Sequence, residues 1–105
     1  MSCVATLSIF PISGEAEHLG PFVARAVEVI RESGLPYQLG PMGTAFEGGF
    51  DEVMAVASRC MKVLEPDFER IYMTLAVDNR RGGADRIEGK VRSVAEALER
   101  NAKKA

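Results

Sequence analysis

Several features that mark particular functional classes are missing from this sequence of 105 residues. It has no tryptophan, one histidine and two cysteines, so neither a disulfide framework nor a clustered His/Cys metal site is indicated. Its 13 basic residues are outnumbered by 15 acidic ones, which argues against a protein that binds nucleic acid by neutralising phosphates. No apolar run approaches the ~20 residues of a membrane-spanning helix, and no secretory signal is visible. We therefore expect a cytoplasmic protein with neither nucleic acid nor membrane as partner.

Catalytic chemistry is not indicated either. The single histidine, His18, lies close to Glu15 and Glu17 and is expected to be a solvated residue before a helix. A catalytic role would need a partnered nucleophile or a metal cluster, and no such pattern is present. Cys3 falls in a predicted strand and Cys60 on the apolar face of a predicted helix, so both are expected to be buried small hydrophobes in a reducing compartment. We expect no enzyme, no catalytic residue, no metal and no cofactor.

The apolar periodicity predicts seven elements in a single domain spanning residues 1–105. Alternation of period two predicts strands, and apolar residues at helical spacing predict helices. Gly34 and Pro36 mark the end of the first helix. The expected strands are 3–12, 37–42, 43–48 and 69–78, and the expected helices are about 19–33, 51–64 and 87–101. This order, βαββαβ plus a C-terminal helix, predicts an α+β ferredoxin-like split βαβ sandwich: a four-stranded antiparallel sheet with helices on one face.

The sheet face without helices lacks charge in its central rows. The side chains expected there are uncharged (Thr6, Ser8, Phe10, Tyr72 and Thr74). A half-apolar face without charges is usually covered, so we expect self-association through this open sheet face. The last helix is expected either to shield an edge of the sheet or to form a second interface.

The segment Pro36–Phe50 combines glycines and prolines with alternating apolar residues, so it is more than a linker. Two short strands joined by a tight turn would place Thr44 and Glu47 among small and aromatic residues, as in a small-molecule cradle. Glu47 is either a surface residue or a carboxylate that accepts hydrogen bonds from a cation or an aminopyrimidine. Tyr37 could add an aromatic face, and Ser8 and Thr44 could each orient a heteroatom. The loop 80–83 (RRGG) is either solvated or an anion-binding loop.

Three stretches, 3–13 (CVATLSIFPIS), 34–48 (GLPYQLGPMGTAFEG) and 86–94 (RIEGKVRSV), closely resemble the small thiamine-binding protein family of bacteria and archaea. The run 43–48 (GTAFEG) is the most specific of them. The resemblance implies a ferredoxin-like fold, dimers that can pair into tetramers, binding of thiamine or its hydroxymethyl-pyrimidine part, and no enzymatic activity. It carries over Ser8, Tyr37, Thr44 and Glu47 as ligand-binding positions, with Leu39 and Gly43 as pocket wall. Phe46 stands where such proteins often have a smaller aliphatic residue.

The resulting hypothesis is a homo-oligomeric binding protein for thiamine or its pyrimidine part, serving storage, sensing or delivery. Two alternatives stay open. An open four-stranded sheet is also the platform of an RNA-binding module, although no Lys or Arg lies among the central strand positions named above. A small dimeric ferredoxin-like enzyme would need an acid–base pair that the sequence does not show.

Overall fold

The structure, a computed structural model, describes residues 2–12 and 19–103. Its elements follow the order β1 (Ser2–Pro11), α1 (Gly20–Glu32), β2 (Tyr37–Leu39), β3 (Thr44–Gly48), α2 (Phe50–Leu64), β4 (Ile71–Arg80) and α3 (Arg86–Lys103). The four strands form one sheet in the order β2-β3-β1-β4, and each neighbouring pair is antiparallel. The predicted α+β, ferredoxin-like arrangement is confirmed.

The bounds of all four strands differ from the prediction by one to three residues, and two of these differences have a clear cause. β2 ends at Leu39 rather than Met42, because Gly40 donates its N–H to the carbonyl of Gly43 at 2.9 Å and closes a turn there. β4 runs to Arg80, two residues beyond the predicted end, because it pairs with β1 along its whole length, from Pro11–Ile71 to Ser2–Arg80. Gly34 ends α1 with a φ of 80°, as the sequence predicted.

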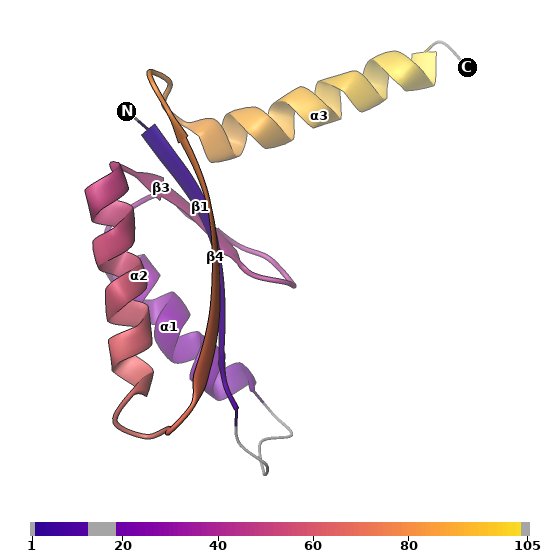
Figure 1. Cartoon of the computed structure of the whole chain (residues 1–105). Coiled ribbons are helices and arrows are strands. Elements are labelled where there is room, and N and C mark those ends of the chain that lie inside the picture. The colour runs from indigo at the N-terminus through magenta and orange to yellow at the C-terminus, as the bar shows by residue number, and fades with distance from the viewer. Residues whose placement is uncertain (1, 13–18, 104–105) are drawn as a thin grey trace.

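The core lies between the sheet and the two helices α1 and α2, which cover the same face (Figure 1). Alternation along β1 sends every second side chain into it: Cys3, Ala5, Leu7 and Ile9 are all buried. Both cysteines are fully buried, as predicted, and burial raises the pKa of the Cys60 thiol to about 11. Phe46 is also fully buried and belongs to this core.

The opposite face of the sheet carries the predicted uncharged rows. The register pairs Ser8 with Thr74 and Phe10 with Tyr72, and these last two rings stack with their centroids 5.5 Å apart. Tyr72 keeps 54% of its surface exposed. We call this surface the open face and define it by Thr6, Ser8, Phe10, Tyr72 and Thr74.

Helix α3 leaves the body of the molecule on the side of the open face, away from α1 and α2 (Figure 1). Among the described elements it packs mainly on β3. Its first turn is fixed to the sheet, and the remaining turns extend outward. None of the helices in the described residues is long and apolar enough to span a membrane.

Candidate functional site

A cavity of about 210 Å³ lies between the sheet, α1 and the β2–β3 turn. We call it the hairpin cavity. Its walls are apolar or uncharged. Three strands, the β2–β3 turn, and α1 with the residue before it contribute Leu7, Ser8, Ile9, Phe10, Leu19, Val23, Ala26, Val27, Leu39, Gly40, Pro41, Met42, Gly43 and Thr44. An uncharged cavity of this kind suits a flat heterocycle better than an ion.

Four of the six predicted ligand-binding residues line the hairpin cavity together: Ser8, Leu39, Gly43 and Thr44. The pairing of Leu39 with Thr44, and of Thr44 with Leu7, explains how they meet across three strands. Thr44 is 3% exposed and faces the helix side of the sheet. It is the hydroxyl that β3 contributes to the cavity wall.

Glycine is required at position 43 by close packing. A Cβ there would come within 3.0 Å of both the Leu7 carbonyl oxygen and the Thr6 Cγ2. Backbone atoms cannot give way as a flexible side-chain end could, so any larger residue would push the turn away from β1. Gly43 thus lets the β2–β3 turn close against β1 and shape the cavity.

Part of the cavity wall is an edge of β1 that has no strand beside it within residues 2–12 and 19–103. β3 pairs with β1 only as far as Leu7, whereas β4 accompanies β1 to Pro11. The Leu7 carbonyl points toward Gly43, and peptide groups two residues apart in a strand point the same way. The N–H and C=O of Ile9 therefore point past the end of β3, toward the cavity, as one donor and one acceptor.

Ser8 borders the cavity with its backbone, whereas Thr44 contributes its side chain. Its side chain is in register with Thr74 on the open face, whereas Leu7 and Ile9 point to the helix side. Since all three line the cavity, the strand edge borders it, and the backbone is the part of Ser8 that faces it.

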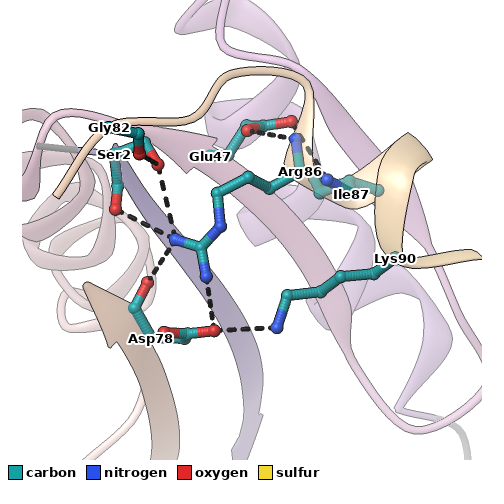
Figure 2. A network of polar contacts seen from close by, with 7 residues as sticks. All are labelled: Ser2, Glu47, Asp78, Gly82, Arg86, Ile87 and Lys90. Carbon is teal, nitrogen blue, oxygen red and sulfur yellow. Dashed lines mark hydrogen bonds and ion pairs between the residues drawn. The ribbon is translucent and has the colours of Figure 1, made fainter. Parts of the chain in front are cut away.

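Glu47 lies elsewhere. It is three residues from Thr44 on the same strand, and an odd separation places two side chains on opposite faces. It pairs with Val4 and faces the α3 side, where only 7% of it is exposed. Its two carboxylate oxygens accept the backbone N–H groups of Arg86 at 3.0 Å and Ile87 at 3.3 Å (Figure 2). Glu47 thus satisfies the free N–H groups at the start of α3, where the positive end of the helix favours a carboxylate.

The side chain of Arg86 completes this attachment (Figure 2). Its guanidinium donates to the carbonyl oxygens of Ser2 and Asp78, each at 3.0 Å, and forms an ion pair with the Asp78 carboxylate. Lys90 donates to the same carboxylate at 2.7 Å, and this bond together with the charge of Arg86 lowers the pKa of Asp78. Only 7% of Arg86 is exposed, so the network, here called the α3 joint, is a partly buried connection between α3 and the three strands β1, β3 and β4.

A second cavity, of about 510 Å³, lies beside the α3 joint. We call it the joint cavity. It contains the other two predicted site residues and is rich in charged groups; its lining is Pro36, Tyr37, Gln38, Glu47, Asp85, Ile87, Glu88, Val91 and Arg92. The predicted cradle is therefore divided between two cavities, with Tyr37 and Glu47 in one and the remaining four residues in the other.

The sequence did not single out Arg86 or the free edge of β1. A buried arginine gives no local signal, because its partners lie 8 and 84 positions away in the chain.

The loop after β4 turns with positive φ at Gly82 and Gly83 and also at Asp85, where φ is 54°. Ser2 donates its hydroxyl to the Gly82 carbonyl at 3.1 Å. His18 lies outside the described residues.

Comparison with known proteins gives one consistent result. The family model described as thiamine-binding protein matches residues 5–95. A UPF0045 protein of Mycobacterium bovis is 37% identical over 99 residues, covering 93% of this chain and 96% of its own. A UPF0045 protein of Methanothermobacter thermautotrophicus is 34% identical over 96 residues, covering 90% and 97%.

Two solved structures share the fold. A hypothetical protein of Methanocaldococcus jannaschii superposes with a TM-score of 0.79 at 30% identity, covering 90% of this chain and 97% of its own. A Thermotoga maritima protein, whose name assigns it provisionally to thiamine biosynthesis or salvage, superposes with a TM-score of 0.78 at 29% identity and covers 90% and 99%. None of these names describes an enzymatic reaction.

Proposed function

Because this chain belongs to the thiamine-binding protein family, we propose that it binds thiamine or its hydroxymethyl-pyrimidine part without transforming it. The protein would act in the cytoplasm in storage, sensing or delivery of that ligand. The name of the similar Thermotoga maritima protein also refers to thiamine, through its biosynthesis or salvage.

The observation that carries the proposal is the hairpin cavity. Sites for drug-sized ligands usually measure roughly 300–1,000 Å³, so a cavity of about 210 Å³ suits one substituted ring rather than two. We assign it to the pyrimidine ring, which is common to both candidate ligands. The thiazolium ring of thiamine would then lie at the mouth of the cavity, where its positive charge stays close to water.

The polar groups of the cavity match an aminopyrimidine. Such a ring carries an exocyclic N–H donor beside a ring-nitrogen acceptor. The C=O and N–H of Ile9 on the free edge of β1 present the complementary pair, as a strand edge does when it binds an extended peptide. Thr44 adds a hydroxyl, and the side chains of Leu19, Val23 and Val27 supply an apolar surface on which the flat ring can rest.

We further propose that the protein is a homo-oligomer, a dimer or tetramer, formed through the open face. The support is the composition of that face: it exposes Tyr72 and carries no charge among its five defining residues. An uncharged, partly aromatic face of this kind is typical of a protein–protein contact.

Isothermal titration calorimetry with thiamine and with hydroxymethyl-pyrimidine tests the ligand assignment. The informative variant is Thr44→Val, which keeps the shape of the side chain and removes its hydroxyl. One lost hydrogen bond is worth roughly 0.5–1.5 kcal/mol, so the affinity should fall roughly 2- to 13-fold for both ligands. Comparable affinities for thiamine and hydroxymethyl-pyrimidine would indicate that the pyrimidine supplies most of the contacts.

Glu47→Gln is the matched control, because it alters the joint cavity and leaves the hairpin cavity intact. It should change the affinity less than twofold. If Glu47→Gln weakens binding and Thr44→Val does not, the ligand occupies the joint cavity instead. Absence of binding heat with either ligand at millimolar concentration would overturn the proposed function.

A further inference from the structure

Leu39 and Met42 line the hairpin cavity and yet remain largely exposed. Met42 is 86% exposed and Leu39 is 63% exposed, whereas Thr44 in the same wall is almost fully buried. Single apolar side chains on a protein surface are common and need no explanation. Here, however, two of them flank Pro41 in one turn and border the same cavity, so they form an apolar rim that water wets in the absence of a ligand.

The backbone of the β2–β3 turn is held in place on both sides of Met42. Gly40 donates its N–H to the carbonyl of Gly43 at 2.9 Å, and Gly43 packs tightly against the Leu7 carbonyl. The side chain of methionine, in contrast, is unbranched and has three rotatable bonds, so it adapts to irregular apolar surfaces. A fixed turn therefore presents an adaptable apolar side chain at the rim of the cavity.

Two separate elements contribute the apolar part of the cavity wall. One is α1, through Val23 and Val27, which are half-buried, and the other is the turn that carries Met42. Because the cavity measures only about 210 Å³, a ring that fills it must contact both elements. The surface of α1 is already partly packed, whereas most of the Met42 side chain has no packing partner until a ring is present.

We propose that Met42 is a cap that closes over the pyrimidine ring when the ligand enters the hairpin cavity. The inference rests on the proposed function, because it takes both the ligand and its cavity from there. In the bound state the thioether of Met42 lies against the heterocycle, a contact that is favourable between sulfur and aromatic rings. Closure also removes the apolar surface of the side chain from water.

The cap and the free edge of β1 recognise different properties of the ligand. The N–H and C=O of Ile9 select a hydrogen-bonding pattern at the edge of the ring, whereas Met42 contacts its face. An apolar contact of this kind depends on area and not on ring substituents. Met42 should therefore strengthen the binding of thiamine and of hydroxymethyl-pyrimidine by the same factor.

Carbon-13 labelling of the methionine methyl groups tests the cap on the full chain. The chain has five methionines, and the variant Met42→Leu assigns the Met42 signal by removing it. On titration with hydroxymethyl-pyrimidine or thiamine, this signal should shift upfield, because the methyl group enters the shielded region above the ring. Met54 is the internal control: it is 41% exposed but lies on α2, outside the cavity, and its signal should not move.

Isothermal titration calorimetry measures what the cap contributes to affinity. Met42→Gln keeps the length of the side chain and makes its end polar, so the affinity for both ligands should fall about tenfold. Met42→Leu keeps the apolar volume and should retain the affinity within about threefold. Because Met42 is exposed in the free protein, neither variant should change the urea midpoint of unfolding. Met54→Gln makes the matched change on α2 and should bind as the unmodified protein does.

Two kinds of failure are distinguishable. Binding heat with an unmoved Met42 signal, or unchanged affinity in Met42→Gln, would overturn the cap and leave the ligand assignment in place. An equal loss of affinity in Met54→Gln would also overturn the cap, because the effect would not depend on the rim. Absence of binding heat with either ligand would overturn the ligand assignment, and the cap with it.

Discussion

Along β3, Thr44 and Phe46 face the two helices α1 and α2, whereas Ala45 and Glu47 face the side from which α3 projects. On the helix side the strand contributes to an uncharged cavity and to the core. On the α3 side its carboxylate holds the start of a helix from 39 positions away in the sequence. Two polar residues of one short motif therefore belong to different parts of the molecule, and each can be altered without touching the other.

On the α3 side, we expect the largest loss of stability from replacing Arg86. Replacing it by methionine removes four hydrogen bonds of the guanidinium to Ser2 and Asp78, two of which go to backbone carbonyl groups. A hydrogen bond from a charged group contributes roughly 1.5–3 kcal/mol, so we expect the free energy of unfolding in urea to fall by about 2–3 kcal/mol.

The matched control for Arg86→Met is Lys90→Met, which removes the other cation bound to Asp78. This pair is about half exposed on both partners, and exposed pairs contribute roughly 0–1 kcal/mol. Equal losses for the two variants would contradict the view that the buried arginine carries the joint.

Glu47→Ala tests the attachment of α3 to strand β3. The start of α3 loses the acceptor of two backbone N–H groups, and removal of a helix-capping side chain costs roughly 0.5–2 kcal/mol. Hydrogen exchange should accelerate in the first turn of α3 and remain slow in β1 and α2. An unchanged exchange rate at residues 86–90 would show that Arg86 alone holds the helix.

Acid should loosen the α3 joint before it reaches the core. The pKa of Asp78 is lowered from its ordinary value of 3.8, chiefly by the hydrogen bond from Lys90. A carboxyl with a lowered pKa in the folded state contributes stability above its unfolded pKa, and this contribution is lost as the pH falls through the folded value. Helical signal from α3 should therefore decrease below about pH 4, and Asp78→Asn should remove this pH dependence. A transition that involves all elements at once would contradict the prediction.

Ser8→Ala tests the hairpin cavity on the helix side, and its expected effect on ligand affinity is the smallest. The Ser8 side chain lies on the open face, and only its backbone borders the hairpin cavity. The affinity for the pyrimidine ligand should change less than twofold in calorimetry, in contrast to Thr44→Val. A loss as large as that of Thr44→Val would place the Ser8 hydroxyl in the site.

The fold could be predicted because its signals are local. Period-two alternation in β1 and β4 and helical spacing in α1 and α2 fixed the faces that meet the core, and Gly34 marked a helix end. The separation of Thr44 from Glu47 was also present in the sequence, since three positions along a strand always reverse the face.

What lay beyond the sequence depends on distant contacts. The partners of Arg86 come from Ser2 and Asp78, and no pattern within a segment connects them. The free edge of β1 depends on β3 being shorter than β1. Tyr37 and Glu47 were grouped with Thr44 because they are close in the chain, but the turn at Gly40–Gly43 and the start of α3 decide which cavity each residue lines.

The pairing of β1 with β4 has a consequence for how this protein folds during its synthesis. β1 is a central strand, and its register joins Ser2 to Arg80 and Pro11 to Ile71. During synthesis, β1 must therefore wait for β4, which follows α1, β2, β3 and α2 in the chain, before its second edge is paired. Contacts this distant in sequence slow folding, and an unpaired strand edge is a site of misassembly while it waits. Transfer of β1 to a position after α3 by circular permutation would leave only α3 between β4 and β1 in the chain, and it should accelerate the pairing of these two strands.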